Sequence, residues 1–177
     1  IIVFFSLKYK IKRSYLYLLL MTLIAPLLLN GPLMSWEYLP DQTKYLKETI
    51  DIRNLDFQSL DGRKSIFYPS LIFSLTPIPI IQTFNDIGLI NRTFISLLII
   101  YLIKNKTKEI FIYFLILSPS LLLYSSVALK ETLVIILTIL SFEALLKKRY
   151  LFFFLPLIFL IIFKKQNGYI ILPMFFF

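Results

Sequence analysis

The side chains of this sequence that could perform acid–base chemistry are concentrated in one polar stretch, residues 34–65. This stretch holds six of the ten carboxylates of the chain. Within it, Tyr45 follows Asp41 at a spacing that places both side chains on one face of a helix. Asp41 could then act as a general base or as a cation ligand, with Tyr45 contacting the substrate. The structural alternative makes Asp41 the N-cap of a solvated surface helix.

Two pairs of charged residues later in the chain, three lysines and one glutamate, are further candidates for substrate binding. Lysine cations at a membrane surface can bind phosphate. Lys130 and Glu131 begin an apolar stretch, and Lys164 and Lys165 separate two others. Each pair also has a structural interpretation. Glutamate is favoured in the first turn of a helix, and lysine can extend its ammonium group to the membrane interface.

Arg92 is the only cation placed well inside an apolar stretch. It could extend to the interface, or it could pair with Asp86 on the preceding turns. A charged residue inside a membrane segment is by default a functional candidate, so Arg92 could instead contact a phosphate or a carboxylate of the polar stretch.

The chain contains no Cys and no His. This composition excludes disulfides, thiol nucleophiles, a Ser-His-Asp triad and every metal site built on His or Cys ligands. Any acid or base catalyst among these residues is therefore Asp, Glu, Lys or Tyr. We expect no metal site of these kinds and no cofactor, apart from a divalent cation that the carboxylates could bind.

The rest of the sequence is strongly apolar and predicts an all-α, polytopic membrane protein. Hydrophobic residues make up 58% of the chain and its mean hydropathy is +0.80, above the usual apolar content of soluble domains. The net charge is +9. Because the basic residues lie in short clusters between apolar blocks, the positive-inside rule explains them, and we expect no nucleic-acid partner. The expected environment is a lipid bilayer, and the resemblance described below implies that it is a bacterial plasma (inner) membrane.

The apolar blocks predict a single transmembrane domain over residues 1–177, with spans at about 14–33, 87–103, 110–126, 131–146, 151–163 and 169–177. Residues 34–65 form a long outer loop containing short helices. Residues 66–82 contain three prolines, which predict a broken segment that is re-entrant or interfacial. Loops 8–13, 104–108 and 147–149 then lie inside, with ten of the nineteen Lys and Arg residues. Because the chain begins without Met and ends in an apolar run, we interpret it as a fragment of a longer membrane protein.

A long outer loop with an Asp-x-x-x-Tyr pattern, here Asp41 and Tyr45, followed by kinked segments and short helices, resembles the GT-C superfamily of polyprenyl-phosphate-dependent glycosyltransferases and the related polysaccharide repeat-unit polymerases. Residues 118–126 (SPSLLLYSS) and 128–131 (ALKE) also resemble a motif of bacterial membrane proteins of that kind. The resemblance implies a catalytic Asp in the first outer loop, and Asp41 is the matching position. Gln42 stands where a second acidic residue is common in that superfamily.

We therefore expect a membrane glycosyltransferase of hexosyltransferase type, or a polysaccharide polymerase of the cell envelope, acting at the outer face of the membrane. The resemblance implies a polyprenyl-(di)phosphate-linked sugar donor and a glycan or lipid acceptor. Asp41 would deprotonate or position the acceptor, and the outer cations would stabilise the leaving phosphate. Two alternatives stay open: a polytopic transporter or flippase, in which the same cations line a path, and a non-catalytic subunit for cell-surface polysaccharide.

Overall fold

The computed structural model of the chain describes all residues except 31, 36–37, 59, 61 and 176–177. The described residues form an all-helical fold without β-strands, as the sequence predicts. The helices are α1 (Ile2–Lys8), α2 (Arg13–Thr22), α3 (Ala25–Leu29), α4 (Asp41–Arg53), α5 (Lys64–Ser74), α6 (Phe84–Lys104), α7 (Glu109–Leu117), α8 (Pro119–Ser126), α9 (Glu131–Leu146), α10 (Tyr150–Phe163), α11 (Lys165–Ile171) and the 3-10 helix η2 (Leu172–Phe175).

Helix α6 is the central element of the fold. It begins with a capping box, in which the Thr83 hydroxyl accepts the N–H of Asp86 (3.4 Å) and the Asp86 carboxylate accepts the N–H of Thr83 (2.7 Å). Its 21 residues contact α1, α3, α4, α7, α8 and α9. At 1.5 Å per residue it is about 32 Å long, enough to cross the hydrocarbon core of a bilayer. Among the described residues it is the only single helix that is long and apolar enough to do so.

The other predicted spans are broken or are shorter than a bilayer crossing requires, although α9 and α10 agree to within one residue with the spans expected at 131–146 and 151–163. The stretch expected as a span at 14–33 contains α2 and α3, which are separated by a turn at Leu23 and Ile24. Residues 110–126 form α7 and α8, which are bent by 53° at Ser118, because a residue that precedes a proline disfavours helical backbone. At 16 and 14 residues, α9 and α10 are only about 24 and 21 Å long. The span expected at 169–177 is occupied by the end of α11 and by η2, and residues 176–177 lie outside the described residues.

The proline-rich segment 66–82 is not one continuous helix. Helix α5 accommodates Pro69 but ends at Ser74, before Pro77 and Pro79. The three side-chain nitrogens of Arg53, at the end of α4, donate to the backbone oxygens of Ser74 (3.1 Å), Thr76 (2.9 Å) and Ile78 (2.7 Å). A guanidinium group from the polar stretch therefore pairs the last carbonyl group of α5 and two carbonyl groups of the segment that follows it.

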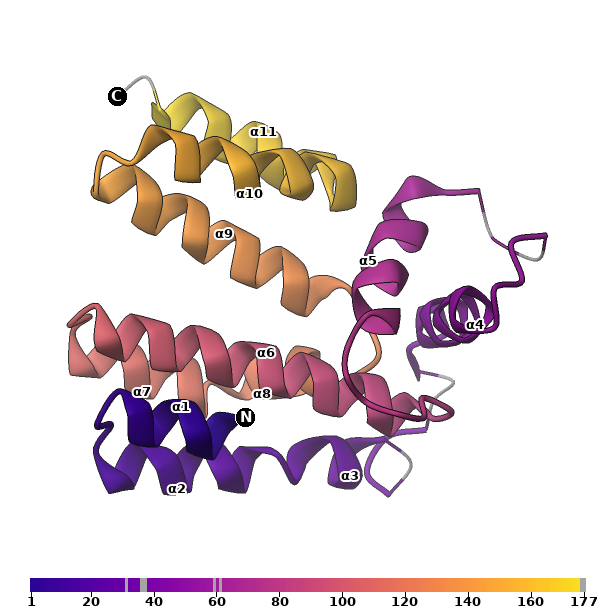
Figure 1. The fold of residues 1–177 in the computed structure, drawn as a ribbon, viewed down its shortest axis with the longest axis horizontal. Helices are drawn as coiled ribbons and strands as arrows, with labels where there is room; N and C mark the ends of the chain where they lie inside the picture. Colours follow the sequence, from indigo (N-terminus) through magenta and orange to yellow (C-terminus); the bar gives the residue numbers. More distant parts are fainter. Residues whose placement is uncertain (31, 36–37, 59, 61, 176–177) are drawn as a thin grey trace.

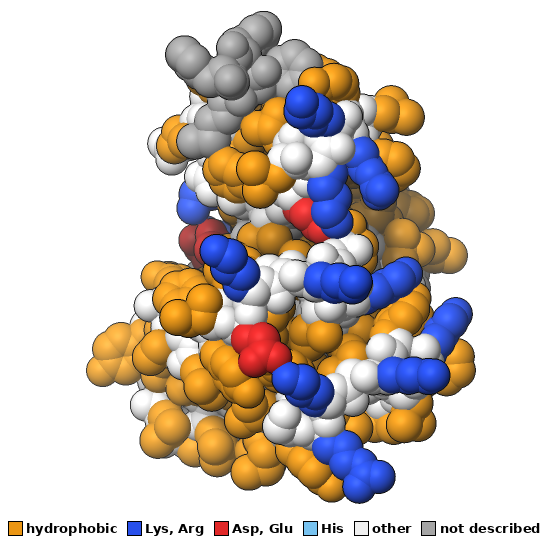
Figure 2. Space-filling model, turned by 90° about the vertical axis from the view of Figure 1, so that its left-hand side faces the viewer, with side chains coloured by type: hydrophobic (Ala, Val, Ile, Leu, Met, Phe, Trp, Pro, Cys, Tyr) orange, Lys and Arg blue, Asp and Glu red, His pale blue; other side chains and the backbone are white. Residues whose placement is uncertain are grey.

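The two ends of the molecule differ in character. The turns α1–α2, α6–α7 and α9–α10 lie at the left-hand end in Figure 1, and α4 and α5 lie at the opposite end. We call the left-hand end, formed by residues 8–13, 104–108 and 147–149, the basic end. Figure 2 shows Lys and Arg side chains spread over this face. All ten of its cations are exposed: Lys8, Lys10, Lys12, Arg13, Lys104, Lys106, Lys108, Lys147, Lys148 and Arg149.

Candidate functional site

A pocket of about 340 Å³ lies at the end of the molecule opposite the basic end. It forms where the first turn of α4, the connection between α8 and α9, and the α10–α11 turn come together. Its lining residues are Leu39, Pro40, Asp41, Tyr45, Leu129, Lys130, Glu131 and Lys164. The fold thus brings together five of the side chains that the sequence singles out. We call this site the α4–α9 pocket.

Helix α4 supplies an exposed carboxylate and a buried phenol to the α4–α9 pocket. The interpretation of Asp41 as an N-cap is wrong, because Pro40 holds that position and Asp41 is the first helical residue. The Asp41 carboxylate is 64% exposed and pairs with Lys44 one turn on (2.5 Å). Tyr45 is 5% exposed. Burial, reinforced by the charges of Glu131 and Asp41, raises the pKa of Tyr45, so its hydroxyl stays protonated and can donate a hydrogen bond.

The ammonium groups of the α4–α9 pocket come from two different elements. Lys130 precedes α9, and its Nζ lies 3.4 Å from the backbone oxygen of Ser65. Burial lowers the pKa of Lys130, although the adjacent Glu131 acts in the opposite direction. Lys164, at the α10–α11 turn, places its Nζ 3.9 Å from Oε1 of Glu131. Glu131 thus holds the Lys164 ammonium group beside that pocket.

This arrangement suits an anionic ligand that also has a group to be deprotonated. Lys130 and Lys164 supply positive charge, and both α4 and α9 begin at the α4–α9 pocket, where the N-terminal end of a helix dipole favours anions. Asp41 supplies an accessible base. The described residues contain no group of three acidic side chains suited to a metal ion. A Mg²⁺ ion here would need substrate phosphate oxygens in addition to one or two carboxylates.

The α8–α9 connection that carries Lys130 is held by three amide side chains. Asn30 Nδ2 donates to the oxygen of Ser126 (2.9 Å), Asn91 Nδ2 donates to the oxygens of Val127 (2.8 Å) and Leu129 (2.9 Å), and Gln42 Oε1 accepts the N–H of Ala128 (2.8 Å). These bonds pair the polar groups of an irregular, buried backbone, which would otherwise be costly. Sequence reasoning missed all three residues as positioning residues. Asn91 could have been recognised in the sequence as a residue with a special role, because an amide side chain is unusual inside an apolar helix.

Two predicted site residues lie outside the α4–α9 pocket. Arg92 is completely buried in α6, and its Nη1 donates to the hydroxyl of Ser125 (2.8 Å). It therefore does not reach an interface, and the expected pairing with Asp86 is wrong, because the Asp86 carboxylate is occupied by the capping box. Arg92 instead supports the end of α8. Lys165 is exposed at the start of α11 and is not among the residues that line the pocket.

Comparison of the chain with protein-family models, with curated proteins and with solved structures finds no match. The α4–α9 pocket, its charges and the surface around it are therefore the observations from which a function must be inferred.

Proposed function

We propose that this chain is part of a multi-pass membrane glycosyltransferase or polysaccharide polymerase. It takes a sugar from a polyprenyl-(di)phosphate donor at the outer face of a bacterial plasma membrane and transfers it to a glycan or lipid acceptor. The observation that carries this proposal is the convergence of Asp41, Tyr45, Lys130, Glu131 and Lys164 on one pocket. These residues come from three distant parts of the chain, and the sequence predicts Asp41 as the catalytic residue and the other four as substrate-binding residues.

The surface of the molecule supports the membrane placement. Helix α10 exposes large apolar side chains, such as Leu151 (80% exposed), Phe152 (63%) and Ile158 (54%). Exposed apolar side chains along a helix are typical of contact with lipid. The basic end gathers ten cations on one face, as the positive-inside rule requires of an inner surface. The α4–α9 pocket, at the other end, then lies at the outer interface, within reach of a lipid-linked phosphate.

The chemistry follows from the groups around the α4–α9 pocket. Lys130 and Lys164 hold the donor phosphate, whose negative charge grows as the bond between the anomeric carbon and the phosphate oxygen breaks. Asp41 accepts the proton of the acceptor hydroxyl as the acceptor oxygen bonds to the anomeric carbon. The electron pair of the broken bond leaves with the phosphate. Tyr45, whose pKa is raised further above neutral pH by burial, can donate a hydrogen bond to a sugar or phosphate oxygen.

The experiment that tests this function is transfer from a lipid-linked sugar donor by the purified protein in vesicles. Asp41→Asn keeps the size of the side chain and removes its basicity. We expect transfer to fall by a factor on the order of 10² to 10⁴, the usual contribution of a positioned base. Asp56→Asn is the matched control, because Asp56 is an exposed carboxylate of the same polar stretch that does not line the α4–α9 pocket. Normal transfer by the Asp41 variant refutes the proposed catalyst.

A further inference from the structure

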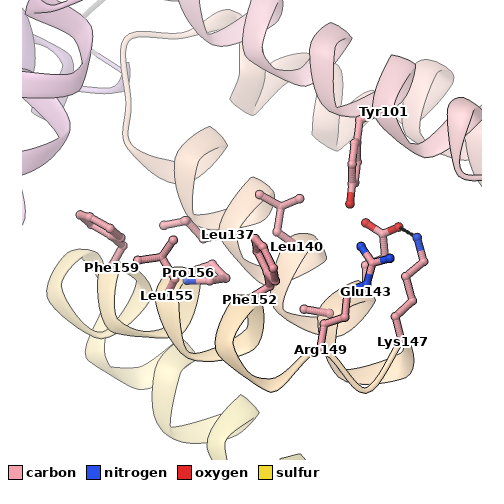
Figure 3. A pocket seen from close by; sticks show the side chains of 11 residues that line it. Tyr101, Leu137, Leu140, Glu143, Lys147, Arg149, Phe152, Leu155, Pro156 and Phe159 are labelled. Carbon is pink, nitrogen blue, oxygen red and sulfur yellow. Dashed lines mark hydrogen bonds and ion pairs between the residues drawn. The ribbon is translucent and has the colours of Figure 1, made fainter. Parts of the chain in front are cut away.

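A groove of about 540 Å³ lies at the basic end, between α9 and α10 and beside α6. Its walls are apolar and include Leu137 and Leu140 of α9 and Phe152, Leu155 and Phe159 of α10. At one end of the groove the lining becomes polar, with Tyr101, Glu143, Lys147 and Arg149 close together, as Figure 3 shows. We call this feature the basic-end groove. Its volume lies within the roughly 300–1,000 Å³ that is usual for ligand sites.

The polar end of the basic-end groove keeps one cation available for a ligand. Glu143 accepts hydrogen bonds from Lys147 Nζ (2.5 Å) and from Asn105 Nδ2 (2.8 Å), so its charge is already paired. The guanidinium group of Arg149 has no hydrogen bond or ion pair within the described part of the chain, and it lines the groove. The Tyr101 hydroxyl points toward the same group of side chains (Figure 3). A planar guanidinium group beside a phenol is well suited to phosphate.

The apolar part of the basic-end groove is open to the surroundings of the molecule. Phe152 is 63% exposed and Leu155 57% exposed, although both line the groove. A ligand that lies in this groove therefore has a long apolar portion that leads into the lipid-facing surface of α10, and a compact anionic portion at Arg149. A phospholipid with an anionic head group has both features.

We propose that the basic-end groove binds an anionic phospholipid of the inner leaflet, with one acyl chain between α9 and α10 and the head-group phosphate at Arg149. Charge complementarity identifies the occupant. The basic end carries ten cations, and only two carboxylates of the described residues, Glu109 and Glu143, lie within four positions of it in the sequence. A zwitterionic head group gains much less from such a surface. This inference rests on the membrane placement proposed above, but it does not depend on glycosyl transfer.

The test measures which lipid stays with the purified protein. The protein is reconstituted in vesicles of equal parts phosphatidylglycerol and phosphatidylcholine and extracted in mild detergent, and the retained lipids are counted by native mass spectrometry. We expect phosphatidylglycerol to be enriched on the wild-type protein. Arg149→Gln should lower this retention about tenfold, because it removes a charged hydrogen bond to phosphate. Lys148→Gln, an equal change of charge at the neighbouring exposed residue outside the groove, should lower it little.

A second pair of variants tests the acyl-chain portion. Leu155→Trp fills the groove and should also reduce phosphatidylglycerol retention, whereas Ile158→Trp, an exposed residue of α10 outside the groove, should not. Equal losses for Arg149→Gln and Lys148→Gln would show only a diffuse charge effect and overturn the site. Equal retention of the two lipids by the wild type, or preferential retention of added polyprenyl phosphate, would overturn the phospholipid assignment. Glycosyl transfer is not the readout, so failure here is distinct from failure of the proposed enzyme.

Discussion

Replacing Gly88 with alanine tests whether the close contact between α6 and α8 supports the fold. A Cβ atom at Gly88 would lie 2.2 Å from the backbone oxygen of Ser126 and 3.0 Å from Cβ of Pro26. Carbon and oxygen atoms that approach each other across helix interfaces stay about 3.3–3.6 Å apart. Gly88→Ala therefore requires the Ser126 carbonyl group to move by about 1 Å. Glycine is needed here for close approach, not for an unusual backbone conformation.

The expected loss of stability can be worked from these contacts. Overpacking of a filled core costs about 1–3 kcal/mol. The Ser126 oxygen also accepts the hydrogen bond from Asn30 Nδ2 (2.9 Å), and its displacement costs about 1 kcal/mol more. Alanine has a higher helix propensity than glycine, which returns about 1 kcal/mol. We expect Gly88→Ala to lower the free energy of unfolding by about 1–3 kcal/mol.

The assay is thermal or denaturant unfolding of the purified protein in detergent, followed by circular dichroism. Gly62→Ala is the matched control, because nothing lies within 4 Å of a Cβ atom added at Gly62. It should leave stability unchanged or raise it by up to about 1 kcal/mol. If both variants have the same unfolding midpoint as the wild type, the packing of α6 against α8 is not as tight as the structure indicates. That result would refute the expected effect of Gly88→Ala.

Three further predictions use other parts of the fold. Gln42→Leu removes the acceptor for the Ala128 N–H and should lower the free energy of unfolding by about 1–3 kcal/mol in the same assay; no change would mean that this bond is dispensable. Burial lowers the pKa of Lys130 below 10.5, so the Lys130 side chain holds its proton more tightly in the unfolded chain than in the folded one. The stability of the wild type relative to Lys130→Gln should therefore rise as the pH increases from the lowered pKa to 10.5. Parallel pH profiles of the two proteins would contradict this. Cysteines introduced at Gln58 and Lys108, in a chain without native Cys, should react with an impermeant thiol reagent from opposite sides of the membrane, and labelling of both from outside would refute the proposed topology.

The helical class and the position of α6 follow from the sequence, because long apolar blocks without strand alternation favour helices. The bounds of α9 and α10 also agree to within one residue with the spans expected at 131–146 and 151–163, whereas the stretches expected as spans at 14–33 and 110–126 are each divided between two helices. The turn at Leu23 and Ile24 has a local signal, because Pro26 follows it in the first turn of α3. The bend at Ser118 was detectable, since Pro119 follows it.

The candidate site is predictable in part. Charge and spacing pick out Asp41, Tyr45, Lys130 and Lys164, but no local pattern shows that they face one another. That juxtaposition depends on long-range bonds, such as the one between Gln42 and Ala128, residues separated by 86 positions. Residues used for such bonds are ordinary polar residues in the sequence, and only the packing of α4 against the α8–α9 connection gives them their role.

The measurement that tests the central claim most directly is equilibrium binding of a polyprenyl diphosphate to the purified protein and to two neighbouring variants. Lys164 lines the α4–α9 pocket, and Lys165, the next residue, does not. If that pocket binds the donor phosphate, Lys164→Gln should raise Kd about tenfold, because a charged hydrogen bond to phosphate is lost, while Lys165→Gln should leave Kd within about twofold. Equal Kd values for the two variants and the wild type would contradict the assignment of the α4–α9 pocket as the donor site.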